Sequence, residues 1–272
     1  MNKHILFVGG GNMGRAIIGG LIANGYPKEL ISVADPDAAA RTRISDDHGV
    51  ATTANATITA TTDIVLLAVK PQIMQPVARE LAAGAGSAHP LYVSIAAGVT
   101  TGQLTQWLGS GSAIVRVMPN TPSMVGCGAS ALFATGDVDT AGREDAAAIL
   151  GAVGTASWVH DEAQLDAVTA LSGSGPAYFF LILEILERIG AELGLEPELA
   201  RELAIETAHG AAVLARTSTD SPGILREQVT SPGGTTAAAL NVLGERDLEG
   251  VLRAALNAAH GRSIELATES GQ

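Results

Sequence analysis

The chain has 272 residues, of which 47% are hydrophobic and only 3% are aromatic. This length and composition predict a globular protein with two domains and exclude a disordered chain. A net charge of −12 disfavours nucleic acid and anionic membrane surfaces as partners, and the single cysteine, Cys127, excludes an intrachain disulfide or a thiolate metal site.

The first residues, MNKHILFVGGG, lack the pattern of a secretory signal, because their apolar run is short and glycines stand where a cleavage region would be. The longest apolar run, residues 178–183, is far shorter than the roughly 20 residues that cross a bilayer. We therefore expect a soluble, cytoplasmic protein without membrane contact.

In the first part of the chain, short apolar segments alternate with amphipathic ones. Several of the apolar segments are continuous, which is typical of strands buried on both faces of a parallel sheet. The alternation predicts a doubly wound α/β domain. The expected strands are residues 4–9, 30–35, 64–69, 91–96, 114–119 and 130–134, and the expected helices lie near residues 12–24, 36–49, 72–84, 101–109 and 140–153.

After residue 162 the sequence predicts only helices. The first of them, residues 176–193, begins with a proline, and its first half is apolar on all sides, which indicates burial on every side. A small helical domain cannot bury such a helix alone, so we predict that a partner subunit covers it in an interleaved homodimer. Further helices are expected at residues 197–217, 222–229, 236–244 and 247–268. The predicted domains are residues 1–162 and 163–272.

The segment GGGNMGRA follows the first expected strand and begins the first expected helix. Gly9, Gly11 and Gly14 match the pattern G-x-G-x-x-G, whose glycines allow a tight turn, close approach of the backbone to a pyrophosphate, and close packing of helix on strand. Asn12 and Met13 open the helix, whose N-terminal amides attract phosphate. The position between strand and helix favours a Rossmann-type dinucleotide site over a glycine-rich turn without a ligand.

The second expected strand ends at Asp35, about 20 residues after the glycines, as this kind of site requires. A carboxylate there holds the ribose 2′-hydroxyl of NAD and repels the 2′-phosphate of NADP. Arg41 and Arg43 reverse this preference if they reach back, and otherwise belong to a solvated helix face. Both interpretations stay open, and the sequence leans to NADH.

Near the end of the chain, the segment SPGGTT combines a turn with the start of an expected helix. Pro232 fixes the turn, and Gly233 and Gly234 allow close approach and unusual backbone angles. The amides of Gly234 and Thr235 are then expected to point outward at a helix N-terminus, where an anion can bind beside the Ser231 hydroxyl. A plain turn with a helix cap is the more common use of such residues, so from the residues alone both interpretations stay open.

Six motifs, in order over nearly the whole chain, resemble those of pyrroline-5-carboxylate reductases. They are FVGGGNMGRAIIGGL near the start, AVKPQ (68–72), SIAAGV (94–99), MPNTP (118–122), LSGSGPAY (171–178) and SPGGTT (231–236). The last two are the most specific, because they lie in the helical domain, where other dehydrogenases differ. The resemblance implies an NAD(P)H-dependent oxidoreductase of proline biosynthesis, which passes hydride from NADPH or NADH to C5 of 1-pyrroline-5-carboxylate and gives L-proline.

The resemblance also implies roles for individual residues. Thr236 reaches the ring nitrogen as the catalytic residue, and the loop at residues 231–236 grips the substrate carboxylate. The implied substrate-binding residues are Ser231, Gly233, Gly234, Thr235 and Thr236. The implied cofactor-binding residues beyond the glycine motif and Asp35 are Asn55, Ala68, Val69, Lys70, Pro71, Ala96, Ala97 and Asn120. Of these, Ala96, Ala97 and Asn120 lie at later strand ends and are expected to line the nicotinamide pocket. For Lys70 a solvent-exposed strand end, and for Asn120 a structural role in its loop, stay open as alternatives.

By the same resemblance, the helical domain binds substrate and forms dimers, which can assemble further into a ring of five. Each active site would combine the nucleotide domain of one chain with the SPGGTT loop of its neighbour. No metal site is expected, because the six histidines are scattered without ligand spacing.

Two other functions compete with the reductase. A β-hydroxyacid dehydrogenase or related imine reductase shares the start of the chain and a helical second domain. Those dehydrogenases rely on a lysine in the second domain, and this chain has none after Lys70. A nucleotide-binding sensor without catalysis is the third possibility.

Overall fold

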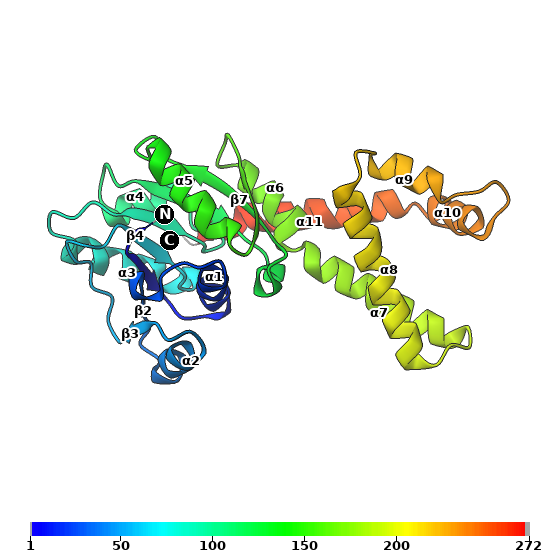
Figure 1. Ribbon diagram of the computed structural model, residues 1–272. Helices are drawn as coiled ribbons and strands as arrows, with labels where there is room; N and C mark the ends of the chain where they lie inside the picture. Colours follow the sequence, from blue (N-terminus) through cyan, green and yellow to red (C-terminus); the bar gives the residue numbers. More distant parts are fainter. Residues whose placement is uncertain (1, 270–272) are drawn as a thin grey trace. The chain divides into compact units, whose positions relative to one another are not determined.

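The computed structural model describes residues 2–269 (Figure 1). It divides into two compact units, the first made of residues 2–174 and 259–269 and the second of residues 175–258. The domain boundary predicted at residue 162 lies before this division and stays a prediction.

The first unit contains an eight-stranded sheet with the strand order β3-β2-β1-β4-β5-β6-β7-β8. All neighbouring strands are parallel except β6 and β7, which are antiparallel. The chain therefore builds the sheet outward in one direction from β1 to β3 and then in the other from β4. The strands are β1 (Ile5–Val8), β2 (Ile31–Ala34), β3 (Ala51–Thr53), β4 (Ile64–Leu67), β5 (Leu91–Ser94), β6 (Ile114–Met118), β7 (Gly128–Ala134) and β8 (Gly154–Trp158).

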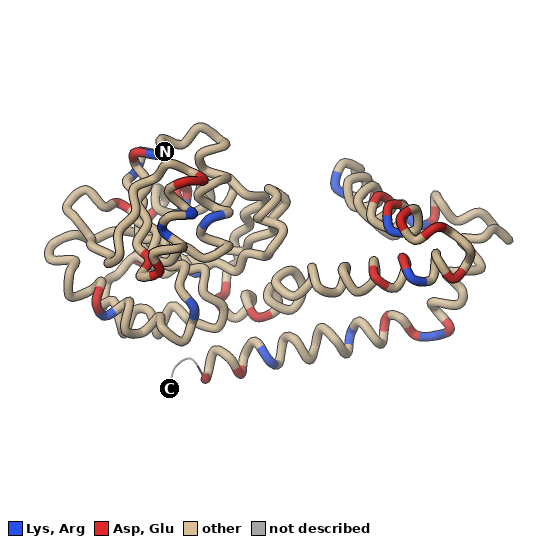
Figure 2. Tube along the Cα trace, turned by 90° about the horizontal axis from the view of Figure 1, so that it is seen from below, with Lys and Arg blue, Asp and Glu red and all other residues tan. Residues whose placement is uncertain are grey.

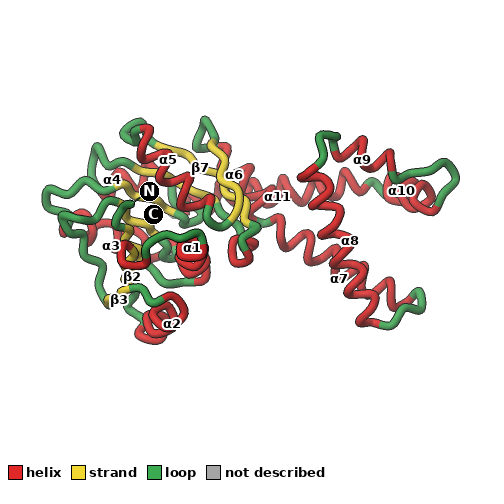
Figure 3. Tube along the Cα trace, viewed as in Figure 1, coloured by secondary structure: helices red, strands yellow, loops and turns green. Residues whose placement is uncertain are grey.

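Side chains alternate across the strands and build one hydrophobic core on each face of the sheet. In β1, Ile5 and Phe7 belong to one core, whereas Leu6 and Val8 belong to the other. The first core is covered by α1 (Asn12–Ala23), α2 (Ala38–His48) and α5 (Thr140–Gly151), and the second by α3 (Pro71–Gly84) and α4 (Thr101–Leu108). Figure 3 shows these helices around the strands. The predicted doubly wound α/β domain is confirmed.

Two edge strands, β3 and β8, were not predicted. β3 has only three residues, and β8 has the mixed sequence GTASW with no fully buried position. β8 begins at Gly154, whose φ is 151° and where a Cβ would stand 2.0 Å from the carbonyl oxygen of Gly128. Edge strands face solvent, so they need none of the continuous apolar residues that mark the inner strands.

The second unit is all-helical, as predicted. Pro197 and Pro222 stand in the first turns of two of its helices, where a proline loses no helical hydrogen bond. The backbone of α7 passes close to that of α8, because the Cβ of Ala200 lies 3.0 Å from where Gly190 would carry one. The helices are α7 (Gly175–Glu192), α8 (Pro197–Thr217), α9 (Pro222–Gln228), α10 (Thr235–Glu245) and the first half of α11 (Leu248–Glu269).

The second unit has almost no core of its own. Within residues 175–258, the buried hydrophobic side chains are Ala200 and Ala204 alone. Phe179 and Phe180 on α7 are both 65% exposed. The chain itself therefore supplies no layer to cover the first half of α7, and its predicted burial against a partner subunit stays a prediction. Other large exposed side chains of the unit include Leu181, Ile182, Leu186, Ile189, Leu199, Leu203, Val213, Leu214, Val242 and Val251.

The helical stretch Gln164–Glu192, which includes α6 (Gln164–Val168), η3 (Thr169–Gly173) and α7, is long and apolar enough to cross a membrane by length and composition. The apolar-run argument did not anticipate this, because small residues such as glycine and serine interrupt the run without making the helix polar. Residues 175–183 carry no charged side chain (Figure 2). A helix that packs against another subunit has the same composition.

Candidate functional site

A cavity of about 490 Å³ opens at the carboxyl ends of β1, β2 and β4, where the sheet order changes direction. In doubly wound sheets this switch point is where ligands bind. The cavity is lined by seven of the predicted cofactor residues, Gly9, Gly11, Asp35, Asn55, Ala68, Val69 and Lys70. Pro71 is the first residue of α3, directly after Lys70.

The structure requires a glycine at two of the three motif positions, for different reasons. Gly9 has a φ of 103°, and a Cβ there would stand 2.7 Å from the carbonyl oxygen of Ala68. A Cβ on Gly14 would stand 3.0 Å from the carbonyl oxygen of Gly9, so this glycine brings α1 close to β1. A Cβ on Gly11 would meet nothing within 4 Å. The fold itself therefore does not require a glycine at position 11, and the open space leaves room for a ligand close to the backbone.

The N-terminus of α1 offers free main-chain donors beside Gly11. The first helical hydrogen bond is donated by the Arg15 amide to the Gly11 carbonyl, at 3.0 Å. The amides of Asn12, Met13 and Gly14 therefore have no acceptor within the helix, and they carry the positive end of its dipole. The Met13 side chain packs against the core, so its contribution here is its amide. This arrangement fits the pyrophosphate of a dinucleotide.

Gly11→Ala separates cofactor binding from folding. Because the space at Gly11 is open, we expect the melting temperature of the free protein to stay unchanged. The added methyl group would keep the pyrophosphate from the backbone and raise the Kd for NADPH by about tenfold. Calorimetric titration and thermal melts check the two quantities, and an unchanged Kd would place the phosphates elsewhere.

The end of β2 holds both a carboxylate and a guanidinium. Asp35 accepts hydrogen bonds from the Gly10 amide at 2.7 Å and from the Asp37 amide at 2.8 Å, so its carboxylate is fixed in the cavity wall. Arg41 reaches back and donates from Nη1 to the carbonyl oxygens of Asp35, at 2.8 Å, and Pro36, at 3.0 Å. Of the two open interpretations of Arg41, the structure therefore supports reaching back, and the remaining guanidinium donors stay available.

The predicted nicotinamide residues lie outside this cavity. Ala96 and Ala97 follow β5 in the loop before α4, with Ala96 buried and Ala97 exposed. Asn120 follows β6, and its side chain is held at both ends: Nδ2 donates to the Ser172 carbonyl at 3.1 Å, and Oδ1 accepts from the Ala129 amide at 2.8 Å. These bonds favour the structural alternative for Asn120, and its contact with cofactor stays a prediction.

The two motifs MPNTP and SGSGP contact each other directly. A Cβ on Gly173 would stand 2.4 Å from Cε of Met118, so the glycine makes room for the methionine. Gly173 ends η3, a wide π-type helical turn, and such turns are frequent at functional sites. Together with the hydrogen bond from Asn120 to Ser172, this contact fixes the loop after β6 to the segment that leads into α7.

In the second unit, the SPGGTT loop leads directly into α10. Gly233 has a φ of 71°, and the Gly234 amide donates to the Ser231 carbonyl at 3.0 Å. The expectation that the Gly234 amide points outward is therefore wrong, because the turn itself uses it. The helical ladder begins with the Ala238 amide, which donates to the Gly234 carbonyl, so the amides of Thr235, Thr236 and Ala237 have no acceptor within the helix. A small anion fits these donors.

No group of three or more histidine, cysteine, aspartate or glutamate side chains that could hold a metal ion occurs among residues 2–269. The sequence did miss one buried ionic contact. Arg116 in β6 is 5% exposed and pairs with Glu162 at 2.8 Å. An arginine inside the apolar strand IVRVM was the available signal, because a buried arginine needs a partner.

Family models of known proteins match both parts of the chain. A family model described as "NADP oxidoreductase coenzyme F420-dependent" matches residues 4–98, and one described as "Pyrroline-5-carboxylate reductase dimerisation" matches residues 162–266. Curated pyrroline-5-carboxylate reductases of Pseudomonas aeruginosa and Haemophilus influenzae are 46% and 43% identical to the chain, and in both alignments 98% of each chain is covered.

Solved structures show the same relationship over the whole fold. A pyrroline-5-carboxylate reductase from Coxiella burnetii is 43% identical, with a TM-score of 0.93, and the match covers 98% of this chain and 99% of that one. The Plasmodium falciparum enzyme, solved with NADP bound, is 29% identical over 98% of both chains, with a TM-score of 0.84.

The sheet, the cavity at its switch point and these relatives define an NAD(P)H-dependent oxidoreductase. Within this class, the chain belongs to the pyrroline-5-carboxylate reductase family.

Proposed function

We propose that the protein reduces 1-pyrroline-5-carboxylate to L-proline with NADPH or NADH. The observation that carries this proposal is the set of free amides at Thr235, Thr236 and Ala237, at the start of α10 in a chain that also has a dinucleotide cavity. A reductase for a small cyclic imino acid needs to hold a carboxylate and to orient a C=N bond. The loop offers donors for the first task and a threonine hydroxyl for the second.

The chain's residues mainly bind and orient. NAD(P)H supplies the hydride when it is bound, and the residues that would hold it are those of the cavity and the α1 N-terminus. Amides at the start of α10 hold the substrate carboxylate, and the hydroxyl oxygen of Thr236 accepts a hydrogen bond from the protonated ring nitrogen. The protonated imine is already electrophilic, so no strong acid is required, and bringing the reacting atoms to roughly 3–3.5 Å is the main task.

The test is an assay of the purified protein with 1-pyrroline-5-carboxylate and either NADPH or NADH. We expect the absorbance of the reduced cofactor to fall, with one L-proline formed for each cofactor oxidised. Absence of oxidation above a blank with both cofactors would refute the proposed reaction.

We further propose that Asp35 and Arg41 let the enzyme use both cofactors. The fixed Asp35 carboxylate suits a ribose 2′-hydroxyl, and Arg41 beside it suits a 2′-phosphate. The sequence-based preference for NADH rested on the Asp35 carboxylate alone, and the position of Arg41 changes it to the use of both cofactors.

Arg41→Ala is expected to lower kcat/KM for NADPH by about tenfold and to leave that for NADH within about twofold. The matched control is Arg43→Ala, because Arg43 is exposed on the same helix. Asp35→Ser should change the ratio in the opposite direction, towards NADPH. Steady-state rates with each cofactor measure the ratio, and equal losses with NADPH and NADH would mean that Arg41 does not face the 2′-position.

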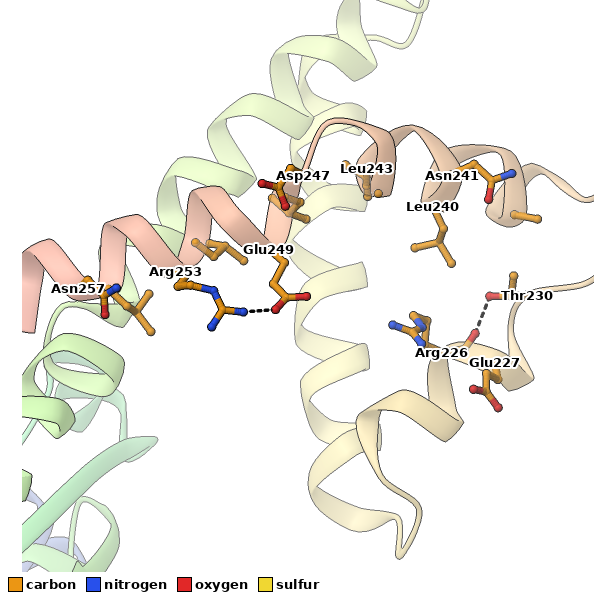
Figure 4. A pocket seen from close by; sticks show the side chains of 15 residues that line it. Arg226, Glu227, Thr230, Leu240, Asn241, Leu243, Asp247, Glu249, Arg253 and Asn257 are labelled. Atoms are coloured by element: carbon orange, nitrogen blue, oxygen red, sulfur yellow. Dashed lines mark hydrogen bonds and ion pairs between the residues drawn. The ribbon is translucent and has the colours of Figure 1, made fainter.

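The helical unit self-associates in this family, and we propose an interleaved homodimer as the form it takes here. A groove of about 1080 Å³ lies between α9 on one side and α10 and α11 on the other (Figure 4). Leu240 and Leu243 face it from α10, and Arg226 and Arg253 stand at its edges. Apolar helical surface of a second copy would fill this groove and cover α7. A ring of five dimers and a cytoplasmic location stay predictions.

Mixed dimers test whether each active site takes parts from two chains. Gly11→Glu places a large negative side chain in the open space for the phosphates, and Thr236→Ala removes the hydroxyl at the substrate. Each variant alone is expected to be inactive or nearly so. After dissociation and reassociation of a mixture, mixed dimers would carry one site with both parts intact, so activity should return. A mixture that stays inactive despite proven exchange would mean that each chain builds its own site.

A further inference from the structure

Glu162, between β8 and α6, connects two elements that lie far from it in the sequence. Its Oε1 accepts hydrogen bonds from the Thr101 amide and from Nη1 of Arg116, both at 2.8 Å. Its Oε2 accepts from the Thr101 hydroxyl at 2.5 Å. One carboxylate therefore fixes the first residue of α4 to the middle of β6.

The surroundings make this contact strong. The Arg116 side chain is 6% exposed and that of Glu162 is 23% exposed, so water competes little for the pair. Thr101 is 6% exposed and begins α4, so the carboxylate also lies at the positive end of that helix. Glu162 is the only acidic side chain that bonds Arg116 or Thr101 among the described residues.

The two elements carry the loops proposed to face the nicotinamide. The loop with Ala96 and Ala97 ends at α4, so its far end is fixed where Glu162 holds Thr101. Arg116 lies two positions before Met118, in the strand that leads to Asn120. On its other side the first loop is fixed by the end of α11, because a Cβ on Gly98 would stand 3.4 Å from Leu266.

We propose that Glu162 is a positioning residue for hydride transfer, which sets the distance between the loop after β5 and the loop after β6. The proposal rests on the proposed function, because it takes these loops as the nicotinamide pocket. Glu162 lies outside the adenosine cavity and is not among the residues that line it. It therefore acts on the nicotinamide half of the cofactor and not on the adenosine half.

Glu162→Gln tests this directly. We expect kcat to fall by about tenfold, because small displacements of oriented groups reduce rates strongly. The Kd for 2′-phospho-ADP-ribose, which lacks the nicotinamide, should stay within about twofold of the wild-type value. The matched control is Asp63→Asn, which removes a carboxylate that also binds a main-chain amide, that of His4, and a cation, Lys3. Asp63 lies before β4, at the amino ends of the strands, whereas the loops after β5 and β6 follow their carboxyl ends, so kcat should not change.

A second pair of variants avoids an unpaired buried arginine. Thr101→Val removes the hydroxyl that donates a hydrogen bond to Glu162, and it should lower kcat severalfold. Thr101→Ser keeps this hydroxyl and should retain a kcat near that of the wild type. Wild-type kcat in both Glu162→Gln and Thr101→Val would overturn the proposal. An equal loss of affinity for 2′-phospho-ADP-ribose would also overturn it, as a general structural effect. If the wild type does not reduce 1-pyrroline-5-carboxylate, the proposed function fails separately. The positioning role is then decided by whether Glu162→Gln weakens NADPH binding more than 2′-phospho-ADP-ribose binding.

Discussion

Thr236→Ala is expected to lower kcat about a hundredfold while the Kd for NADPH stays unchanged. The hydroxyl is proposed to hold the ring nitrogen, so its loss affects the oriented imine and not the nucleotide cavity. The change should not disturb the helix, because Thr236 is the second residue of α10, its N-cap residue is Gly234, and alanine favours helix. Stopped-flow and steady-state rates with 1-pyrroline-5-carboxylate, together with calorimetric titration of NADPH, measure both effects.

Thr236→Ser is the matched control, because it keeps the hydroxyl and removes only the methyl group. It should retain most of the wild-type rate. Equal losses of kcat and of cofactor affinity in Thr236→Ala would indicate a folding defect, and wild-type turnover would remove Thr236 from the reaction.

Phe180→Glu is expected to abolish both self-association and reductase activity. Phe180 is 65% exposed on a helix whose unit has only two buried hydrophobic side chains, both alanines, so the free chain loses little when this side chain becomes polar. In the proposed dimer, the change removes about 1.5–3 kcal/mol of apolar burial and places an unpaired charge in the interface. Analytical ultracentrifugation should show a monomer, and coupled assays should show no proline formation.

The nucleotide unit has its own two cores, so the Phe180→Glu monomer should still bind 2′-phospho-ADP-ribose. Phe180→Leu keeps an apolar side chain and should remain a dimer. A fully active monomer would contradict the proposal that the active site depends on association, and an unchanged dimer would place α7 outside the interface.

The inner part of the fold was predictable because burial determines it. Strands such as β4, with the sequence IVLL, must be apolar on both faces. In three helices, a proline in the sequence marks the first turn: Pro71, Pro197 and Pro222. The edge strand β8 was not predictable, since its exposed side permits polar residues. The exposure of α7 within one chain agrees with the expectation that a small helical domain cannot bury this helix alone.

The candidate site, like the fold, could be predicted from the sequence only in part. Gly9 was predictable because its positive φ and its close approach to Ala68 exclude a side chain, and Asp35 because it follows the second strand at the spacing such sites require. The reach of Arg41 was not, because a long side chain has many rotamers. Glu162 was missed because its partners lie 46 and 61 residues away, and only the folded sheet brings them together.

A crystal structure with L-proline and oxidised cofactor bound tests the central claim most directly. We expect the proline carboxylate within hydrogen-bonding distance of the Thr235 and Thr236 amides, and its C5 roughly 3–3.5 Å from C4 of the nicotinamide. A proline carboxylate bound by other groups, with the turn before α10 unoccupied, would contradict the account.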